Sequence, residues 1–333
     1  MKEHDIRPEA LLNKYVELSA KDAEICFGDA TRYETSCVAC GELQSEHQFE
    51  KNGFSFSQCN ICGTLFQNPR PSIDSFEAFY RDSESSRYWA EVFFPAVSEM
   101  RLEKIFKPRV KRLVALCEEK GIDVENLIDV GAGYGLFIEE WRQLNPLTKI
   151  VAVEPSSSLA EECRSKGFDV VEEIVENVKG YNDSANLVTC FEVLEHVHEP
   201  LDFLKDLKEL AKPGGYVFIS TLGIDGFDLQ VLWEKSSQIS PPHHINFLST
   251  DGFVKLFQRA GLEDIWVITP GQLDVDIVRN AYKKDPELLR GQRFIEKLIK
   301  DDKKADAFQQ FLVEQRMSSH VWILGRKPND TKA

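Results

Sequence analysis

Short apolar runs alternate with amphipathic stretches in the middle of the chain. Runs rich in β-branched residues occur at 126–130, 149–153, 186–191 and 216–221, and the stretches between them show helical spacing. The helical stretch at 101–121 ends in a glycine, which is typical of a helix C-terminus. Alternation of this kind predicts an α/β fold, a parallel sheet with helices on both faces.

The two ends of the chain show other patterns. The apolar runs at 263–271 and 319–327 are separated by a mainly helical segment, and together they predict a closing, hairpin-like pair of strands at an antiparallel edge of the sheet. Residues 11–18 have apolar positions at helical spacing and predict a helix for packing or dimerisation. Residues 76–97 are dense in aromatic side chains, which favours a core segment or a lid over a ligand.

These patterns predict a chain of five consecutive parts. They are an N-terminal helical arm (1–35), a metal-binding module (36–72), an aromatic-rich connector or lid (73–104), an α/β core (105–270), and a helical excursion with the final core strand (271–333).

Composition and charge narrow the class of protein. Of the 333 residues, 42% are hydrophobic, enough for one large core with an appendage. No apolar run is long enough to span a bilayer, and the first residues show no apolar leader, so we expect a cytoplasmic protein with no membrane partner. The net charge of -15 disfavours a nucleic-acid partner, because duplex binding depends on Lys and Arg, but it allows a small anionic substrate.

Four of the eight cysteines are spaced like metal ligands. Cys37, Cys40, Cys59 and Cys62 follow the pattern C-x2-C-x18-C-x2-C, which fits zinc held by four thiolates. A glycine follows each pair and permits a tight turn around the sulfurs. Because sulfur would fill all four positions, the predicted Zn²⁺ is structural. We expect it to stiffen a rim beside the substrate pocket, and support of dimer contacts stays open as the plainer alternative.

A glycine-rich turn follows the first predicted core strand. Gly131, Gly133 and Gly135 form G-x-G-x-G, whereas a dinucleotide-binding turn would need a glycine at Leu136. Glycines here let a ligand approach the backbone at the carboxyl end of the strand. The second strand ends in Glu154, whose carboxylate can accept both hydroxyls of an adenosine ribose.

These motifs resemble those of class I S-adenosylmethionine-dependent methyltransferases. The resemblance rests on "DVGAGYG" at 129–135, Glu154, "VLEH" at 193–196 and "KPGG" at 212–215, and it implies a Rossmann-like sheet, mostly parallel with the last strand antiparallel. It also implies that S-adenosylmethionine is the cofactor. Its binding residues would be Asp129, Gly131, Ala132, Gly133, Gly135, Glu154, Pro155, Phe191 and Glu192.

The whole chain is similar to a narrower group, the zinc-containing sugar methyltransferases, including deoxysugar C-methyltransferases of antibiotic and surface-polysaccharide pathways. The cysteine pairs, "FQNPRP" at 66–71 and "PPHHINFLS" at 241–249 carry this similarity. It implies a nucleotide-linked sugar or glycan precursor as the methyl acceptor. Only a short segment follows Gly261, whereas those enzymes have a long C-terminal domain.

Two adjacent histidines are candidates for the catalytic base. His243 and His244 lie in a Pro-stiffened loop, and His244 aligns with the histidine of an H-x-x-Y-F-S segment in the sugar C-methyltransferases. A base would take the proton from a sugar hydroxyl or from a carbon beside a ketone. The alternative is structural, with both histidines capping the next helix or bonding a loop carbonyl.

Two other functions stay open. One is a methyltransferase for a protein, lipid or RNA acceptor that docks on the zinc module, and the other is a cofactor-binding scaffold without catalysis. A homodimer through the terminal helices also stays open.

Overall fold

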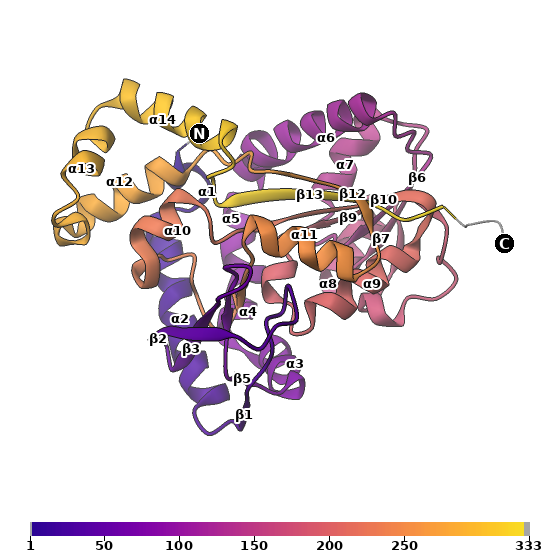
Figure 1. The fold of residues 1–333 in the computed structure, drawn as a ribbon. Coiled ribbons are helices and arrows are strands. Elements are labelled where there is room, and N and C mark those ends of the chain that lie inside the picture. Colours follow the sequence, from indigo (N-terminus) through magenta and orange to yellow (C-terminus); the bar gives the residue numbers. More distant parts are fainter. Residues whose placement is uncertain (1, 330–333) are drawn as a thin grey trace. The chain divides into compact units, whose positions relative to one another are not determined.

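Seven strands form the larger sheet of the protein. The computed structural model describes residues 2–329, and the strand order in this sheet is β12-β13-β10-β9-β6-β7-β8 (Figure 1). The strands are β6 (Asn126–Val130), β7 (Lys149–Val153), β8 (Asp169–Val171), β9 (Ala185–Phe191), β10 (Ala211–Leu222), β12 (Glu263–Ile268) and β13 (His320–Arg326).

The strands from β10 to β8 are parallel, and β13 is not. The pairs β10–β9, β9–β6, β6–β7 and β7–β8 all run parallel. Gly214 N donates to Lys327 O, whereas Gly223 N donates to Ser319 O, so β13 runs antiparallel to β10. The predicted Rossmann-like fold, mostly parallel with an antiparallel last strand, is therefore confirmed.

Helices alternate with these strands as the sequence pattern predicts. Two successive strands, β9 and β10, are buried along most of their length, which is typical of a parallel sheet covered on both faces. The helical elements of this part are η2 (Leu102–Phe106), α6 (Lys107–Lys120), α7 (Leu136–Leu144), α8 (Ser157–Ser165), η3 (Val175–Asn177), η4 (Leu194–His196) and α9 (Pro200–Leu210). Helix α6 ends at Gly121, whose φ of 66° gives a left-handed cap.

The chain divides into two compact units. One unit contains residues 99–221, 254–267 and 323–333 and holds most of the larger sheet. The other contains residues 1–98, 222–253 and 268–322. Each is described below by itself.

The second unit contains a four-stranded sheet of order β11-β4-β3-β2. Its strands are β2 (Ser45–Lys51), β3 (Phe54–Cys59), β4 (Leu65–Gln67) and β11 (Asn246–Phe247), and a separate pair joins β1 (Arg32–Tyr33) to β5 (Arg70–Pro71). Phe54, Phe56, Leu65 and Phe247 are fully buried members of its apolar core. This core stabilises a sheet whose strands are too short to be stable alone.

Helices complete this unit. They are α1 (Glu3–Ile6), α2 (Glu9–Phe27), α3 (Ile73–Asp82), α4 (Glu84–Tyr88), η1 (Trp89–Phe93), α5 (Phe94–Arg101), α10 (Phe227–Leu232), η5 (Trp233–Lys235), α11 (Thr250–Arg259), α12 (Asp274–Lys284), η6 (Pro286–Leu289), α13 (Arg293–Ile299) and α14 (Asp302–Glu314). Helices α5 and α11 continue into the first unit. Before the last strand, α12, α13 and α14 pack together around a second apolar core (Figure 1).

The N-terminal helix packs on the aromatic-rich connector. The ring of Tyr15, in α2, lies 5.1 Å from that of Trp89 and 6.3 Å from that of Phe93. Phe27, at the end of α2, contacts Phe76 at a ring distance of 5.0 Å. Phe76, Phe79 and Phe93 of this connector are buried and contribute to the core, and the lid and dimer alternatives stay predictions. Among residues 2–329, no helix combines the length and apolarity of a membrane span.

Candidate active site

The glycine turn between β6 and α7 has the backbone of a ligand-binding loop. Gly131, Gly133 and Gly135 have φ of 74°, 55° and 69°, in the left-handed region that side chains disfavour. A Cβ on Gly131 would lie 2.8 Å from Cγ2 of Val193, which leaves no room for a side chain. A Cβ on Gly133 would meet no atom within 4 Å, so this glycine borders open space. The turn therefore leaves room at Gly133 for a ligand to approach the backbone.

Glu154 closes this turn from the neighbouring strand. Its Oε2 accepts a hydrogen bond of 2.8 Å from Gly133 N, and its Oε1 accepts one of 2.9 Å from Ser156 N. Burial raises the pKa of the Glu154 carboxyl, and the two amides oppose that shift. A carboxylate has about four acceptor sites, so two remain for hydroxyl groups of a ligand. Ala132 N donates to Val153 O, and Pro155 is exposed.

Asp129 lies beneath the turn at the end of β6. It is 2% exposed, and Oδ1 accepts a hydrogen bond of 2.7 Å from Thr189 Oγ1 in β9. Burial raises the pKa of Asp129 to about 7, and the Thr189 hydroxyl opposes that rise. The structure thus shows Asp129 joining two strands at the turn.

Two side chains that motif analysis did not identify, Arg109 and Ser220, bind Glu192 at the end of β9. Glu192 has a φ of 55°, uncommon for a residue with a side chain. Its Oε1 accepts from Arg109 Nη2 at 2.8 Å and from Ser220 Oγ at 2.6 Å. The Arg109 guanidinium also lies 4.9 Å from the centre of the Phe191 ring. Arg109 is one basic residue among several in an amphipathic helix, so no local pattern distinguishes it.

The residues present fit an S-adenosylmethionine site, which the sequence resemblance implies. The open space at Gly133 and the remaining acceptor sites of Glu154 lie side by side at the carboxyl ends of β6 and β7, where α/β sheets bind ligands.

The four predicted metal ligands form a cluster. Their Sγ atoms all lie within 4.8 Å of one another, and the pairs Cys37–Cys62 and Cys40–Cys59 are 3.6 Å and 3.5 Å apart. Four sulfurs about 2.3 Å from a tetrahedral Zn²⁺ would be about 3.8 Å apart, close to these distances. All eight cysteines are free thiols. The donor set therefore fits a closed tetrahedral metal site.

The two cysteine pairs are built alike. Gly41 N donates to Cys37 O at 2.8 Å, and Gly63 N donates to Cys59 O at 2.9 Å. Both glycines have positive φ, 83° and 76°. The repeated turn is the reason why each pair is followed by glycine, as the sequence predicts.

His243 is enclosed by side chains of its own unit. It is 4% exposed, and its Nε2 lies 3.0 Å from Ser85 Oγ. The rings of Phe79 and Tyr15 lie 4.8 Å and 5.2 Å from its ring. Its carbonyl accepts from the Tyr80 hydroxyl at 3.2 Å. These contacts favour the structural alternative for His243.

His244 has a different environment. Its side chain is half-buried, and Nδ1 lies 2.6 Å from Gln238 O. A carbonyl oxygen only accepts, so Nδ1 carries the proton, and in the neutral ring Nε2 holds the lone pair. The Gln238 side chain in turn donates to Asp228 Oδ2 at 3.1 Å. This arrangement defines the tautomer that a general base at Nε2 requires.

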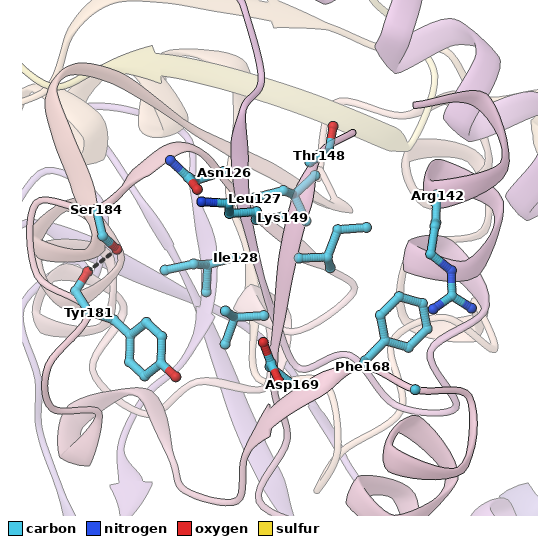
Figure 2. Close-up of a pocket in the computed structure, with 13 residues that line it drawn as sticks. Asn126, Leu127, Ile128, Arg142, Thr148, Lys149, Phe168, Asp169, Tyr181 and Ser184 are labelled. Atoms are coloured by element: carbon cyan, nitrogen blue, oxygen red, sulfur yellow. Dashed lines mark hydrogen bonds between the residues drawn. The ribbon is translucent and has the colours of Figure 1, made fainter. Parts of the chain in front are cut away.

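A pocket of about 470 Å³ lies at the other end of the strands. Asn126, Lys149 and Asp169, which line it, are the first residues of β6, β7 and β8. Figure 2 shows Tyr181 on one side and the Phe168 ring beneath the Arg142 guanidinium on the other. Because Gly131 and Glu154 lie at the carboxyl ends, this pocket is separate from the candidate cofactor site.

Comparison with known proteins agrees with this geometry. Residues 100–267, half of the 333-residue chain, match the model of a family described as "Methyltransferase domain". Similar curated proteins include the ubiquinone biosynthesis O-methyltransferases of Pectobacterium atrosepticum, 30% identical over 47% of this chain and 64% of that protein, and of Escherichia fergusonii, 31% identical over 47% and 65%. The match thus spans less than two thirds of each relative.

Among solved structures, the plantazolicin methyltransferase BpumL has a similar fold. It was solved with a monoazolic desmethylPZN analog and SAH; the TM-score is 0.50 with 12% identity, and the match covers 76% of this chain and 94% of that one. This similarity concerns the fold. The family model, which matches half of the chain, shows the family: the chain belongs to the methyltransferase-domain family.

Proposed function

We propose that this protein is an S-adenosylmethionine-dependent methyltransferase that acts on a small molecule. The observation that carries the proposal is the glycine turn closed by Glu154, at the carboxyl end of the first core strand. When bound, S-adenosylmethionine supplies an electrophilic methyl group on a sulfonium. Gly131 and Gly133 let the backbone approach this cofactor, and Glu154 accepts hydrogen bonds from its ribose hydroxyls.

The base in this proposal is His244. An acceptor hydroxyl, or a carbon beside a ketone, gives its proton to Nε2, because Nδ1 is engaged as a donor by the Gln238 carbonyl. A positioned general base of this kind typically contributes about 10²- to 10⁴-fold in rate. His243 supports the loop through its contacts with Ser85 and Phe79.

The acceptor class in the proposal is a nucleotide-linked sugar or a glycan precursor. Similarity of the cysteine pairs, "FQNPRP" and "PPHHINFLS" to the sugar methyltransferases supports it. The names of the curated relatives support transfer to oxygen, since both are O-methyltransferases. In the same proposal the cysteine cluster holds one structural Zn²⁺, because its four thiols match the ligand number and spacing of such sites.

A methyl-transfer assay tests this proposal. The full chain is incubated with S-adenosylmethionine carrying an isotopically labelled methyl group, in parallel with nucleotide-sugars, peptides and RNA. We expect label in a nucleotide-sugar, and a large loss of turnover in His244→Ala with unchanged cofactor affinity. Label in peptide or RNA alone would overturn the acceptor class. Cofactor binding with no transfer to a broad metabolite extract would instead favour the non-catalytic scaffold.

A further inference from the structure

The loop that carries the two histidines is hydrogen-bonded to the cysteine cluster's own sheet. We call residues 236–249 the histidine loop and residues 37–67 the cysteine module. Strand β11, at the end of the histidine loop, pairs antiparallel with β4 of the module, with Asn246 opposite Phe66. Gln67 N adds a bond of 2.9 Å to Ile245 O, next to His244. The loop therefore supplies the fourth strand of the module's sheet.

A second contact joins the loop to the metal ligands themselves. Ser249 N donates to Thr64 Oγ1, and that oxygen lies 3.3 Å from Cys62 Sγ. The Ser249 hydroxyl donates to Cys62 O. Beside a metal-bound thiolate, the Thr64 hydroxyl would donate to sulfur while it accepts from Ser249 N. Thr64 is fully buried, so this link is shielded from water.

A third contact joins the tip of the β2–β3 hairpin to the start of the loop. Lys51 Nζ donates to Ser236 O at 2.7 Å, and Asn52 Nδ2 donates to Pro241 O at 3.1 Å. Asn52 and Gly53 have φ of 48° and 74°, as expected of a tight two-residue hairpin turn. The turn thereby aims the Asn52 amide at the loop.

We propose that the cysteine module positions the histidine loop, so that metal at the four cysteines determines where His244 lies. The metal would hold the two cysteine pairs in place, and with them Thr64 and β4, which bind the loop just after His244. Lys51 and Asn52, at the tip of the β2–β3 hairpin of the same module, bind the loop before His244. This inference rests on the proposed function only in treating His244 as the base. The attachment of the histidine loop to the cysteine module does not depend on any reaction, and it can be measured without an activity assay.

Amide hydrogen exchange on the full chain measures directly how firmly the histidine loop is attached to the cysteine module. Metal content is determined, the metal is removed with a chelator, and exchange is followed in peptides from 236–249 and from 126–135. We expect protection in the histidine loop to fall when the metal leaves, while the glycine turn at 131–135 stays protected. Unchanged protection of the loop after complete metal loss would overturn the inference.

A variant that keeps all four cysteines tests the attachment of the histidine loop without removing the metal. Asn52→Gly removes the amide that reaches Pro241 and preserves the left-handed turn. Gln48→Ala, a half-buried change in β2 that removes an amide donating to Glu46 O within the same strand, is the matched control. In Asn52→Gly, with metal content equal to wild type, we expect faster exchange in the histidine loop and the control to match wild type. Equal exchange in both variants would contradict the proposal.

Turnover separates this inference from the proposed function. If His244 is the base, Asn52→Gly lowers kcat about tenfold, within the range of a misplaced base, with KM and cofactor affinity unchanged. In the pH profile of Asn52→Gly, the pH at which kcat/KM falls on the acid side should also differ from that of wild type. A merely structural defect would not shift this pH. If Asn52→Gly shows faster exchange in the histidine loop but a wild-type kcat, the attachment of the loop to the module is supported and the assignment of His244 as the base is overturned.

Discussion

At the scale of single residues, Gly133 is the position where a side chain would interfere most directly with the proposed cofactor site. A Cβ there has no protein neighbour, so it would enter the space assigned to the ligand. Gly133→Val should weaken S-adenosylhomocysteine binding at least about 100-fold, or about 2.7 kcal/mol, in titration calorimetry.

Gly180→Val is the matched control for this change. Gly180 also has positive φ, 82°, and no atom within 4 Å of its added Cβ, so both variants carry the same left-handed backbone cost. Wild-type binding by Gly180→Val and weak binding by Gly133→Val would support the loop assignment. Equal affinities in the two variants would refute it.

Asp129 makes the stability of the protein depend on pH. Its pKa rises from 3.8 to about 7 because of burial, so the folded state binds this proton more tightly than the unfolded chain does. Its contribution to the free energy of unfolding is therefore full below about pH 4 and is lost as the pH rises through about 7.

In wild type, the urea midpoint should fall between about pH 4 and about pH 7 because of Asp129, and Asp129→Asn, which has no ionisable group at this position, should flatten that fall. Asp169→Asn, an exposed change at the start of β8, should leave the wild-type slope. A slope in Asp129→Asn equal to that of wild type would show that Asp129 is not the group responsible.

At the residue scale, sequence reasoning succeeded for the four cysteines: two C-x2-C pairs predicted one cluster, and the structure brings their sulfurs together. Glu154 was predicted from its place at the end of the second strand, and the structure shows it bonded to Gly133 N, while the cofactor-binding role of both residues stays a prediction. Arg109 was missed because its partner Glu192 is far away in sequence, and a buried ion pair between distant elements leaves no local signature.

At the scale of elements, the pair of Arg109 and Glu192 connects α6 to the end of β9. The Arg109 side chain is 9% exposed and that of Glu192 33%. Arg109→Met would leave the carboxylate without its cation, and we expect a loss of about 1–3 kcal/mol in the free energy of unfolding, less than for a fully buried pair.

A double-mutant cycle with Glu192→Gln measures the coupling between the two side chains, because removal of both charges avoids an unpaired ion. Arg164→Met breaks the more exposed pair with Glu172 and should lower the free energy of unfolding less than Arg109→Met does, because solvent screens that pair. A cost for Arg109→Met no greater than for Arg164→Met would contradict the structural role of this pair.

Strand β11 shows the limit of pattern analysis at this scale. It has two residues, Asn246 and Phe247, too short for any periodicity, and its partner β4 lies far earlier in the chain. The histidine loop was therefore predicted only as a stiff connection. Its attachment to the cysteine module follows from a long-range pairing that only the fold reveals.

At the scale of the whole molecule, the alternation of apolar runs and helical stretches was sufficient to predict the larger sheet and its antiparallel last strand. The same patterns predicted parts that follow one another along the chain. In the structure, one compact unit is formed by three segments that are far apart in the sequence, residues 1–98, 222–253 and 268–322. Such gathering depends on side-chain packing between segments, as in the core shared by Phe27, Phe56 and Phe247.

In the proposed function, Glu154 and the glycine turn together bind S-adenosylmethionine. Titration calorimetry of the full chain with this cofactor tests it most directly, with Glu154→Ala and the exposed Glu172→Ala compared at equal folded fraction. We predict saturable one-to-one binding by wild type and by Glu172→Ala, and loss of binding in Glu154→Ala, because the ribose hydroxyls lose their acceptor. No binding by wild type, or wild-type affinity in Glu154→Ala, would contradict the claim.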